Sequence, residues 1–152
     1  MNDFDFLVGS WDVHNRRLLD YLDPDSGWEE FPGRTRGSVH FAGGAHFDEI
    51  AFPDKGGSGL TLRLYDRDAG EWSLNWASSR TGRLNPPVRG RFGPDGTGEF
   101  YGDDTYDGKD VKIRFRWSGI SATTARWEQW FSADGGDTWV LNWIMEMTRA
   151  EE

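Results

Sequence analysis

Apolar and polar residues alternate strictly in several stretches of this chain, and few folds accommodate such a pattern. In 111–117, which reads VKIRFRW, the apolar residues occupy every second position and basic residues fill the others. Successive side chains of an extended strand point to opposite faces, so the spacing predicts a strand with one buried face. The alternation recurs in 60–65 and 72–78. We therefore expect an all-β chain.

Turn residues separate the alternating segments. Twenty glycines and six prolines fit many tight turns, and we expect about ten antiparallel strands. Pro86 and Pro87 break the pattern within 78–88, where we expect a longer connection. Strands with one apolar and one charged face favour a closed up-and-down barrel, with a two-sheet sandwich as the alternative. A length of 152 residues predicts a single domain over 1–152.

The composition limits the partners and the chemistry. A net charge of −9 disfavours nucleic acid and anionic membrane surfaces as partners. The absence of cysteine excludes disulfides and thiolate chemistry. The first residues lack the pattern of a signal peptide, and no apolar run approaches membrane-spanning length, so we expect a cytoplasmic protein. Nine tryptophans predict a core built from large rings.

The stretch FSADGGDTW at 131–139 could mark a catalytic site, a metal loop or a turn. Its flanking segments can pair as a hairpin with Gln129 opposite Leu141 and Trp127 opposite Trp143, which predicts a turn. The order Ser-x-Asp-x-Gly-x-Thr-Trp resembles the Asp-box of sialidases, a structural turn away from the chemistry. A calcium loop is disfavoured because the stretch offers only two carboxylates.

The segment Gly9-Ser10-Trp11 resembles the Gly-x-Trp signature of lipocalin-like (calycin) barrels. In lipocalins a basic residue at the end of the last strand packs over that tryptophan, and Arg149 stands at the matching place. Nearly the whole chain is similar to an uncharacterised bacterial family of small lipocalin-like β-barrels, and arginines far outnumber lysines, as in high-GC bacterial genomes. The resemblance implies the barrel fold and a small ligand, but no activity.

The alternation also assigns inward positions. With the apolar face taken as the interior, it places Phe41, Phe47 and Ala51 inside among mostly apolar residues, with a few polar exceptions that can orient a ligand. Arg17 and Glu49 could pair with each other inside the barrel. The predicted ligand-binding residues are Asn15, Arg17, Glu49, Trp76, Ser78, Trp127, Gln129 and Trp143.

Metal and cofactor sites find little support in the sequence. The three histidines, His14, His40 and His46, lie at dissimilar positions without ligand spacing, so we expect no metal. Some calycin-like barrels bind haem through a late-strand histidine, which is absent here, and we expect no cofactor. No serine stands in a nucleophile-elbow context, and the catalytic residues are unknown.

Three functions remain open. The first is binding of a small, mainly hydrophobic or aromatic ligand in the barrel cavity. The second is a small cyclase- or isomerase-type enzyme in which Glu49 or Arg17 handles a proton or an oxyanion. The third is a filled barrel that serves as a protein-interaction module, in which exposed Trp28 or Trp130 would lie in a homodimer interface.

Overall fold

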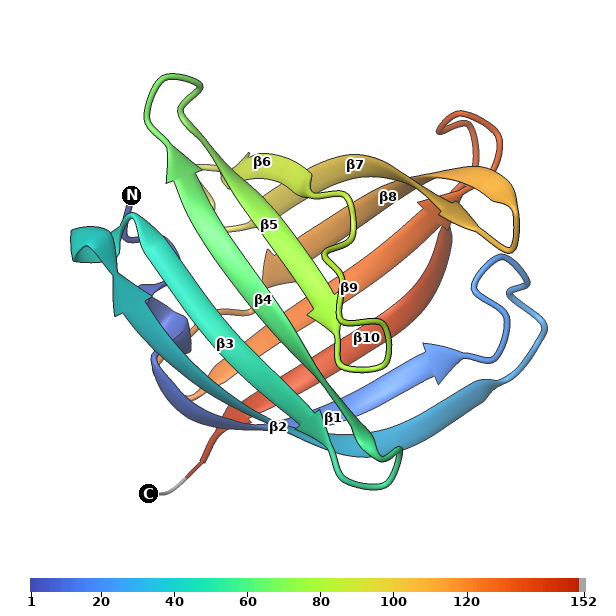
Figure 1. Cartoon of the computed structure of the whole chain (residues 1–152), viewed down its shortest axis with the longest axis horizontal. Coiled ribbons are helices and arrows are strands. Elements are labelled where there is room, and N and C mark those ends of the chain that lie inside the picture. The colour runs from blue at the N-terminus through green and yellow to red at the C-terminus, as the bar shows by residue number, and fades with distance from the viewer. Residues whose placement is uncertain (151–152) are drawn as a thin grey trace.

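The computed structural model describes residues 1–150, which form ten antiparallel strands and two short 3₁₀ turns. Figure 1 shows the strands wound into a barrel around a central interior. The elements are η1 (Asp5–Leu7), β1 (Gly9–Leu18), β2 (Trp28–His40), η2 (Phe41–Gly43), β3 (Ala45–Phe52), β4 (Gly57–Asp66), β5 (Glu71–Ser78), β6 (Val88–Phe92), β7 (Gly98–Tyr106), β8 (Lys109–Ser118), β9 (Thr124–Ser132) and β10 (Val140–Arg149).

Each strand pairs with the next one along the chain, and β10 pairs with β1, so the sheet closes. This up-and-down order confirms the predicted fold class and excludes the two-sheet sandwich. Closure gives the backbone groups of every strand a partner strand on both sides. The interior is lined by one face of all ten strands, and this face holds the core.

The first and last strands meet beside the N-terminal segment. Trp11 and Arg149 are cross-strand partners, and the guanidinium of Arg149 lies 4.3 Å from the centre of the indole ring. Arg149 also donates hydrogen bonds to the carbonyls of Phe6 and Val8, at 2.8 and 2.7 Å. The terminal arginine therefore packs over the Gly-x-Trp tryptophan as predicted, and it fixes η1 across one end of the barrel.

The loop between β9 and β10 is the predicted structural turn. The Asp134 carboxylate accepts hydrogen bonds from Ser132 Oγ at 2.7 Å and from the backbone amide of Thr138 at 2.9 Å. The Thr138 hydroxyl donates to the same carboxylate, and Ser132 Oγ accepts from the amide of Gly136. Hydrogen bonds, first of all from the Thr138 hydroxyl, lower the pKa of Asp134 to about 2. The side chains of the Asp-box thus hold the loop in shape.

The register of this hairpin differs from the prediction. Gln129 pairs with Trp143, and Trp127 pairs with Met145, with an irregularity between Leu141 and Trp143. The pairing is displaced by one residue at Val140↔Phe131 and by two residues beyond the irregularity, so Trp143 still points inward. A β-bulge inserts one extra residue in one strand, and a prediction that assumes strict alternation cannot locate that residue.

The faces of β3 and β4 are the reverse of the expectation. Phe47, Glu49 and Ala51 were predicted to point inward, but all three are exposed. His46 and Asp48 are buried instead, and they face Arg63 of β4, which is 4 % exposed.

The reversal begins at η2, the connection that precedes β3. Phe41, predicted inside, lies in this turn with a positive φ of 53° and is 75 % exposed. The interior of β3 and β4 therefore includes a charged pair, while Leu60 of β4 lies on the outside with 40 % exposure. The rule that the apolar parity faces inward fails here because the buried charges compensate one another.

Adjacent strands β5 and β6 make the shortest ladder of the barrel, with pairs only from Trp72↔Gly90 to Leu74↔Val88. Beyond Leu74, the connection 79–87 crosses over the end of β5, and the amide of Asn85 donates to the carbonyl of Trp76 at 2.8 Å. This longer connection matches the break predicted from Pro86 and Pro87. Figure 1 shows it as a long loop between the end of β5 and the start of β6.

Candidate ligand site

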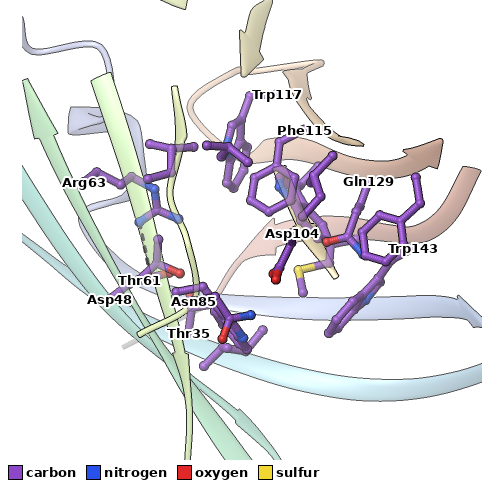
Figure 2. Close-up of a pocket in the computed structure, with 18 of the residues that line it drawn as sticks. Thr35, Asp48, Thr61, Arg63, Asn85, Asp104, Phe115, Trp117, Gln129 and Trp143 are labelled. Atoms are coloured by element: carbon purple, nitrogen blue, oxygen red, sulfur yellow. Dashed lines mark hydrogen bonds and ion pairs between the residues drawn. The ribbon is translucent and has the colours of Figure 1, made fainter. Parts of the chain in front are cut away.

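The barrel interior encloses a cavity of about 280 Å³. One wall consists of rings from β8, β9 and β10, and Trp76 of β5 lies across from them. Figure 2 shows Phe115, Trp117 and Trp143 on one side and Arg63 with Asp48 on the other. Such a mostly apolar cavity with a few polar groups is the usual form of a small-molecule site.

Four of the eight predicted ligand-binding residues line this cavity: Trp76, Trp127, Gln129 and Trp143. Trp127 and Trp143 meet edge to face, with ring centres 5.6 Å apart. Gln129 Nε2 donates to Asn142 Oδ1 at 2.9 Å, a contact that the bulge in β10 makes available. Trp127 and Trp143 therefore form an aromatic surface with the Gln129 amide beside it, and Trp76 lies on the other side of the cavity.

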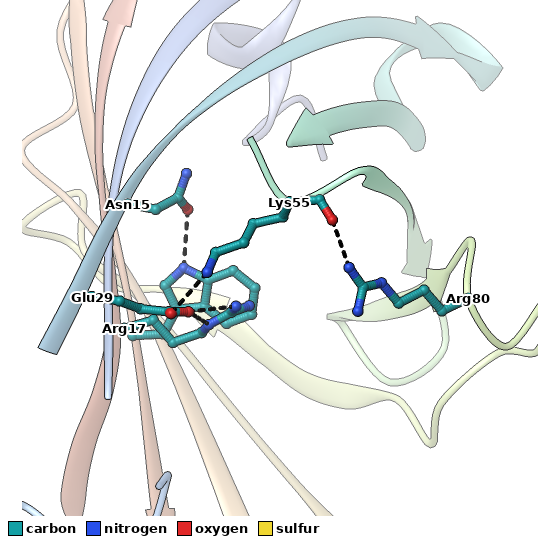
Figure 3. Close-up of polar contacts among 6 residues, drawn as sticks. Asn15, Arg17, Glu29, Lys55 and Arg80 are labelled. Carbon is teal, nitrogen blue, oxygen red and sulfur yellow. Dashed lines mark hydrogen bonds and ion pairs between the residues drawn. The ribbon is translucent and has the colours of Figure 1, made fainter. Parts of the chain in front are cut away.

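Asn15 is fully buried and contacts Trp143, a residue of the cavity wall, without lining the cavity itself. Its Oδ1 accepts a hydrogen bond from Trp143 Nε1 at 3.0 Å, which fixes the orientation of the indole ring. Figure 3 shows this contact beside the polar groups at the barrel rim. Asn15 therefore acts on the cavity through Trp143 and does not line it.

Arg17 pairs with Glu29 and not with Glu49. Its guanidinium donates two hydrogen bonds to Glu29 Oε1, at 3.1 and 2.7 Å, and it lies 4.8 Å from the centre of the Trp143 ring. Lys55 donates to the other oxygen of Glu29 at 2.8 Å, as Figure 3 shows. The hydrogen bond from Lys55, and after it those from Arg17, lower the pKa of Glu29. Arg17 is thus neutralised at the rim.

Glu49 and Ser78 lie apart from the cavity. Glu49 is exposed on the outer face of β3, so its predicted inward orientation is wrong. Ser78 ends β5, where its Oγ accepts a hydrogen bond from the amide of Arg80 at 3.2 Å. A serine at the end of a strand commonly stabilises the following turn in this way.

A buried polar cluster that the sequence analysis missed lies on the wall opposite the rings. Arg63 Nη1 donates to His46 Nδ1 at 2.9 Å and to Asp48 Oδ1 at 3.1 Å. Burial, and after it the charge of Arg63, lowers the pKa of His46 to about 3, so the ring is neutral at pH 7. His46 and Asp48 are two residues apart on β3, so a prediction that placed Asp48 inside would also have placed His46 there. Arg63 is the cross-strand partner of His46 on β4.

Residues 1–150 contain no group of three or more histidine, cysteine or acidic side chains that could hold a metal ion. Over the same residues, no helix has the length and apolar character needed to cross a membrane.

Comparisons with known proteins bear on the fold. The structure is similar to that of the S-type phycobiliprotein lyase CPES from Guillardia theta, with a TM-score of 0.59 and 13% sequence identity over 98% of this chain and 91% of that one. No protein-family model matches the chain, and no curated protein matches it. The likeness over nearly the full length of both chains supports the closed up-and-down barrel that the strand order shows.

Proposed function

We propose that this barrel binds a small, mainly hydrophobic or aromatic molecule in its interior. The observation that carries the proposal is the cavity of about 280 Å³, whose wall is formed largely by tryptophan and phenylalanine rings. Burying an apolar ligand against these rings removes water from both surfaces, which is the main favourable term in such binding. Gln129 and the Arg63 cluster supply the few polar groups that orient a ligand.

The neighbouring fold is in accord with this proposal, since the similar structure is that of a phycobiliprotein lyase. A pigment-like molecule is therefore one chemical class for the ligand. The alternative of a cyclase- or isomerase-type enzyme relied on Glu49 or Arg17 as the reactive group. Glu49 lies on the outside of the barrel, and Arg17 is paired with Glu29, so neither residue fits that role. An interaction module with a filled interior does not fit a cavity of this size.

The test uses N-phenyl-1-naphthylamine, a neutral fluorophore whose emission rises in apolar surroundings. We expect saturable binding with one site per barrel and quenching of tryptophan emission, because the ring system would lie against Trp127 and Trp143. In Leu74→Trp the new ring fills the cavity, and affinity should fall by about tenfold or more. Leu60→Trp adds the same ring on the outer face of the adjacent strand and should bind like the wild type. Absence of binding to the wild type contradicts the proposal.

A further inference from the structure

Arg63 is the least satisfied charged group in the described interior. It is 4 % exposed, and its Nη1 atom serves both His46 and Asp48. Its Nε atom is buried and finds no hydrogen-bond partner among residues 1–150. Among the same residues, Nη2 has no hydrogen bond either, whereas Arg17 and Arg114 each use Nε and Nη2 together to hold a carboxylate.

Nε and Nη2 form one edge of the planar guanidinium group. Two parallel N–H donors on such an edge match the two oxygens of a carboxylate, and this bidentate geometry is the strongest that arginine offers. A buried donor without a partner is destabilising, so an unpaired edge inside the barrel favours a ligand that supplies acceptors. Figure 2 shows Arg63 on the cavity wall, with its bond to Asp48 directed away from the rings.

Two other unpaired donors in the cavity lining point to the same ligand chemistry. Trp117 lines the cavity, its Nε1 is buried without a partner in the described chain, and its ring lies 5.6 Å from the Arg63 guanidinium. The hydroxyl of Thr35, also in the lining, is likewise buried and unpaired within residues 1–150. Unpaired donors in the cavity lining therefore come from three strands, β2, β4 and β8.

The charges around the cluster decide between an anionic and a cationic ligand. His46 is neutral, so Arg63 and Asp48 are the two charges of the cluster. At this cluster a cationic ligand would have to displace Arg63 from Asp48 or lie beside another buried cation, which is unfavourable. The third charged residue of the lining, Asp104, belongs to β7 and is partly exposed. A carboxylate can use the free edge of Arg63 and leave the pair with Asp48 intact.

We propose that the ligand is an aromatic carboxylic acid whose carboxylate occupies the Nε–Nη2 edge of Arg63 while its ring packs against Trp117 and Trp127. This inference rests on the proposed binding function and specifies its ligand class. Arg63 contributes specificity, and the rings contribute the apolar contact area. Arg17, engaged by Glu29, takes no part in recognition of the acid group.

The experiment compares 2-naphthylacetate with 2-naphthylacetamide by titration calorimetry at pH 7. The two molecules share the ring and differ in the charged head group. The wild type should bind the acid about tenfold or more tightly than the amide. Arg63→Lys keeps a cation beside Asp48 but removes the planar fork, and it should abolish most of this preference. Arg17→Lys is the matched control and should preserve it.

Asp48→Asn gives a second, independent readout. The amide retains an acceptor for Arg63 Nη1 but removes the competing negative charge, so affinity for the acid should increase about tenfold while affinity for the amide stays unchanged. Circular dichroism and the melting temperature establish that each variant is folded.

The outcomes separate the two proposals. Equal affinity for the acid and the amide overturns the carboxylate assignment, and so does tighter binding of 2-naphthylmethylammonium than of the acid. In either case, binding of the neutral fluorophore still supports the ligand cavity. If the wild type binds none of the four molecules, the ligand-binding function itself is wrong. An acid preference that persists in Arg63→Lys also overturns the role of Arg63.

Discussion

Two inward-directed arginines of the barrel occupy opposite electrostatic situations. Arg17 stands at the rim with a side chain 23% exposed, and its Nε and Nη2 both donate hydrogen bonds to Glu29. Arg63 is almost fully buried, shares one nitrogen between two partners and leaves one edge open. A satisfied ion pair at a rim organises structure, whereas an incompletely satisfied one in a cavity can select a ligand.

The largest difference should appear in stability. Arg63→Met leaves Asp48 buried without its cation and should lower the free energy of unfolding by about 3–5 kcal/mol. Arg17→Met removes a partly exposed pair, where Lys55 still compensates Glu29, and should cost about 1 kcal/mol or less. Urea unfolding at pH 7 measures both. Equal losses would mean that the two arginines do not differ as described.

A smaller difference should appear in the pH dependence of stability. The lowered pKa of His46, about 3 against 6.5 for the free side chain, means that the unfolded chain binds more protons between these values. The free energy of unfolding should therefore fall as pH is lowered from 7 to 5, with a slope of at most about 1.4 kcal/mol per pH unit. The pKa of Glu29 is also lowered, but from 4.5, so its stabilisation is lost only at more acidic pH.

His46→Asn should flatten the slope between pH 7 and pH 5, because asparagine offers an acceptor to Arg63 without a titrating ring. His14→Asn, which makes the same substitution at an exposed histidine on β1, is the matched control. Urea unfolding midpoints at the two pH values provide the measurement. A slope that survives in His46→Asn would assign the effect to other groups.

The smallest effect should come from a carboxylate that serves only local structure. Asp134→Ala removes the acceptor for the amide and hydroxyl of Thr138 and should lower the melting temperature modestly. The affinity for N-phenyl-1-naphthylamine should remain that of the wild type, because the loop lies outside the cavity lining. A loss of affinity with unchanged stability would give the loop a functional role that the contacts do not indicate.

Much of the fold could be predicted because it depends on patterns that survive small errors. Alternation identified the strands, and the packing of the terminal Arg149 over Trp11 followed from the resemblance of Gly9-Ser10-Trp11 to the lipocalin signature. The aromatic half of the site was also predictable, since Trp127 and Trp143 keep their parity across the two-residue register shift. When the pairing of two strands shifts by an even number of residues, each side chain stays on the same face of the sheet.

The polar half of the site was not predictable by the same rule. Alternation cannot tell which face is inside when both faces carry mixed residues, and the leucines of β4 favoured the wrong face. Arg63 and Asp48 are tolerated inside only because they pair across two strands, and that pairing depends on the register of β3 with β4. Glu49, one residue away from Asp48, was therefore chosen in its place.

The ladder between β1 and β10 has a consequence for how the chain reaches its native state. It joins Trp11 to Arg149, nearly the whole length of the chain apart, and so closes the longest loop in the molecule. Contacts between residues so distant in sequence form slowly, because the entropy of the intervening chain must be overcome before they stabilise anything. During synthesis β1 cannot pair with β10 until β10 has left the ribosome. Until then the sheet has two open edges, one of them at β1.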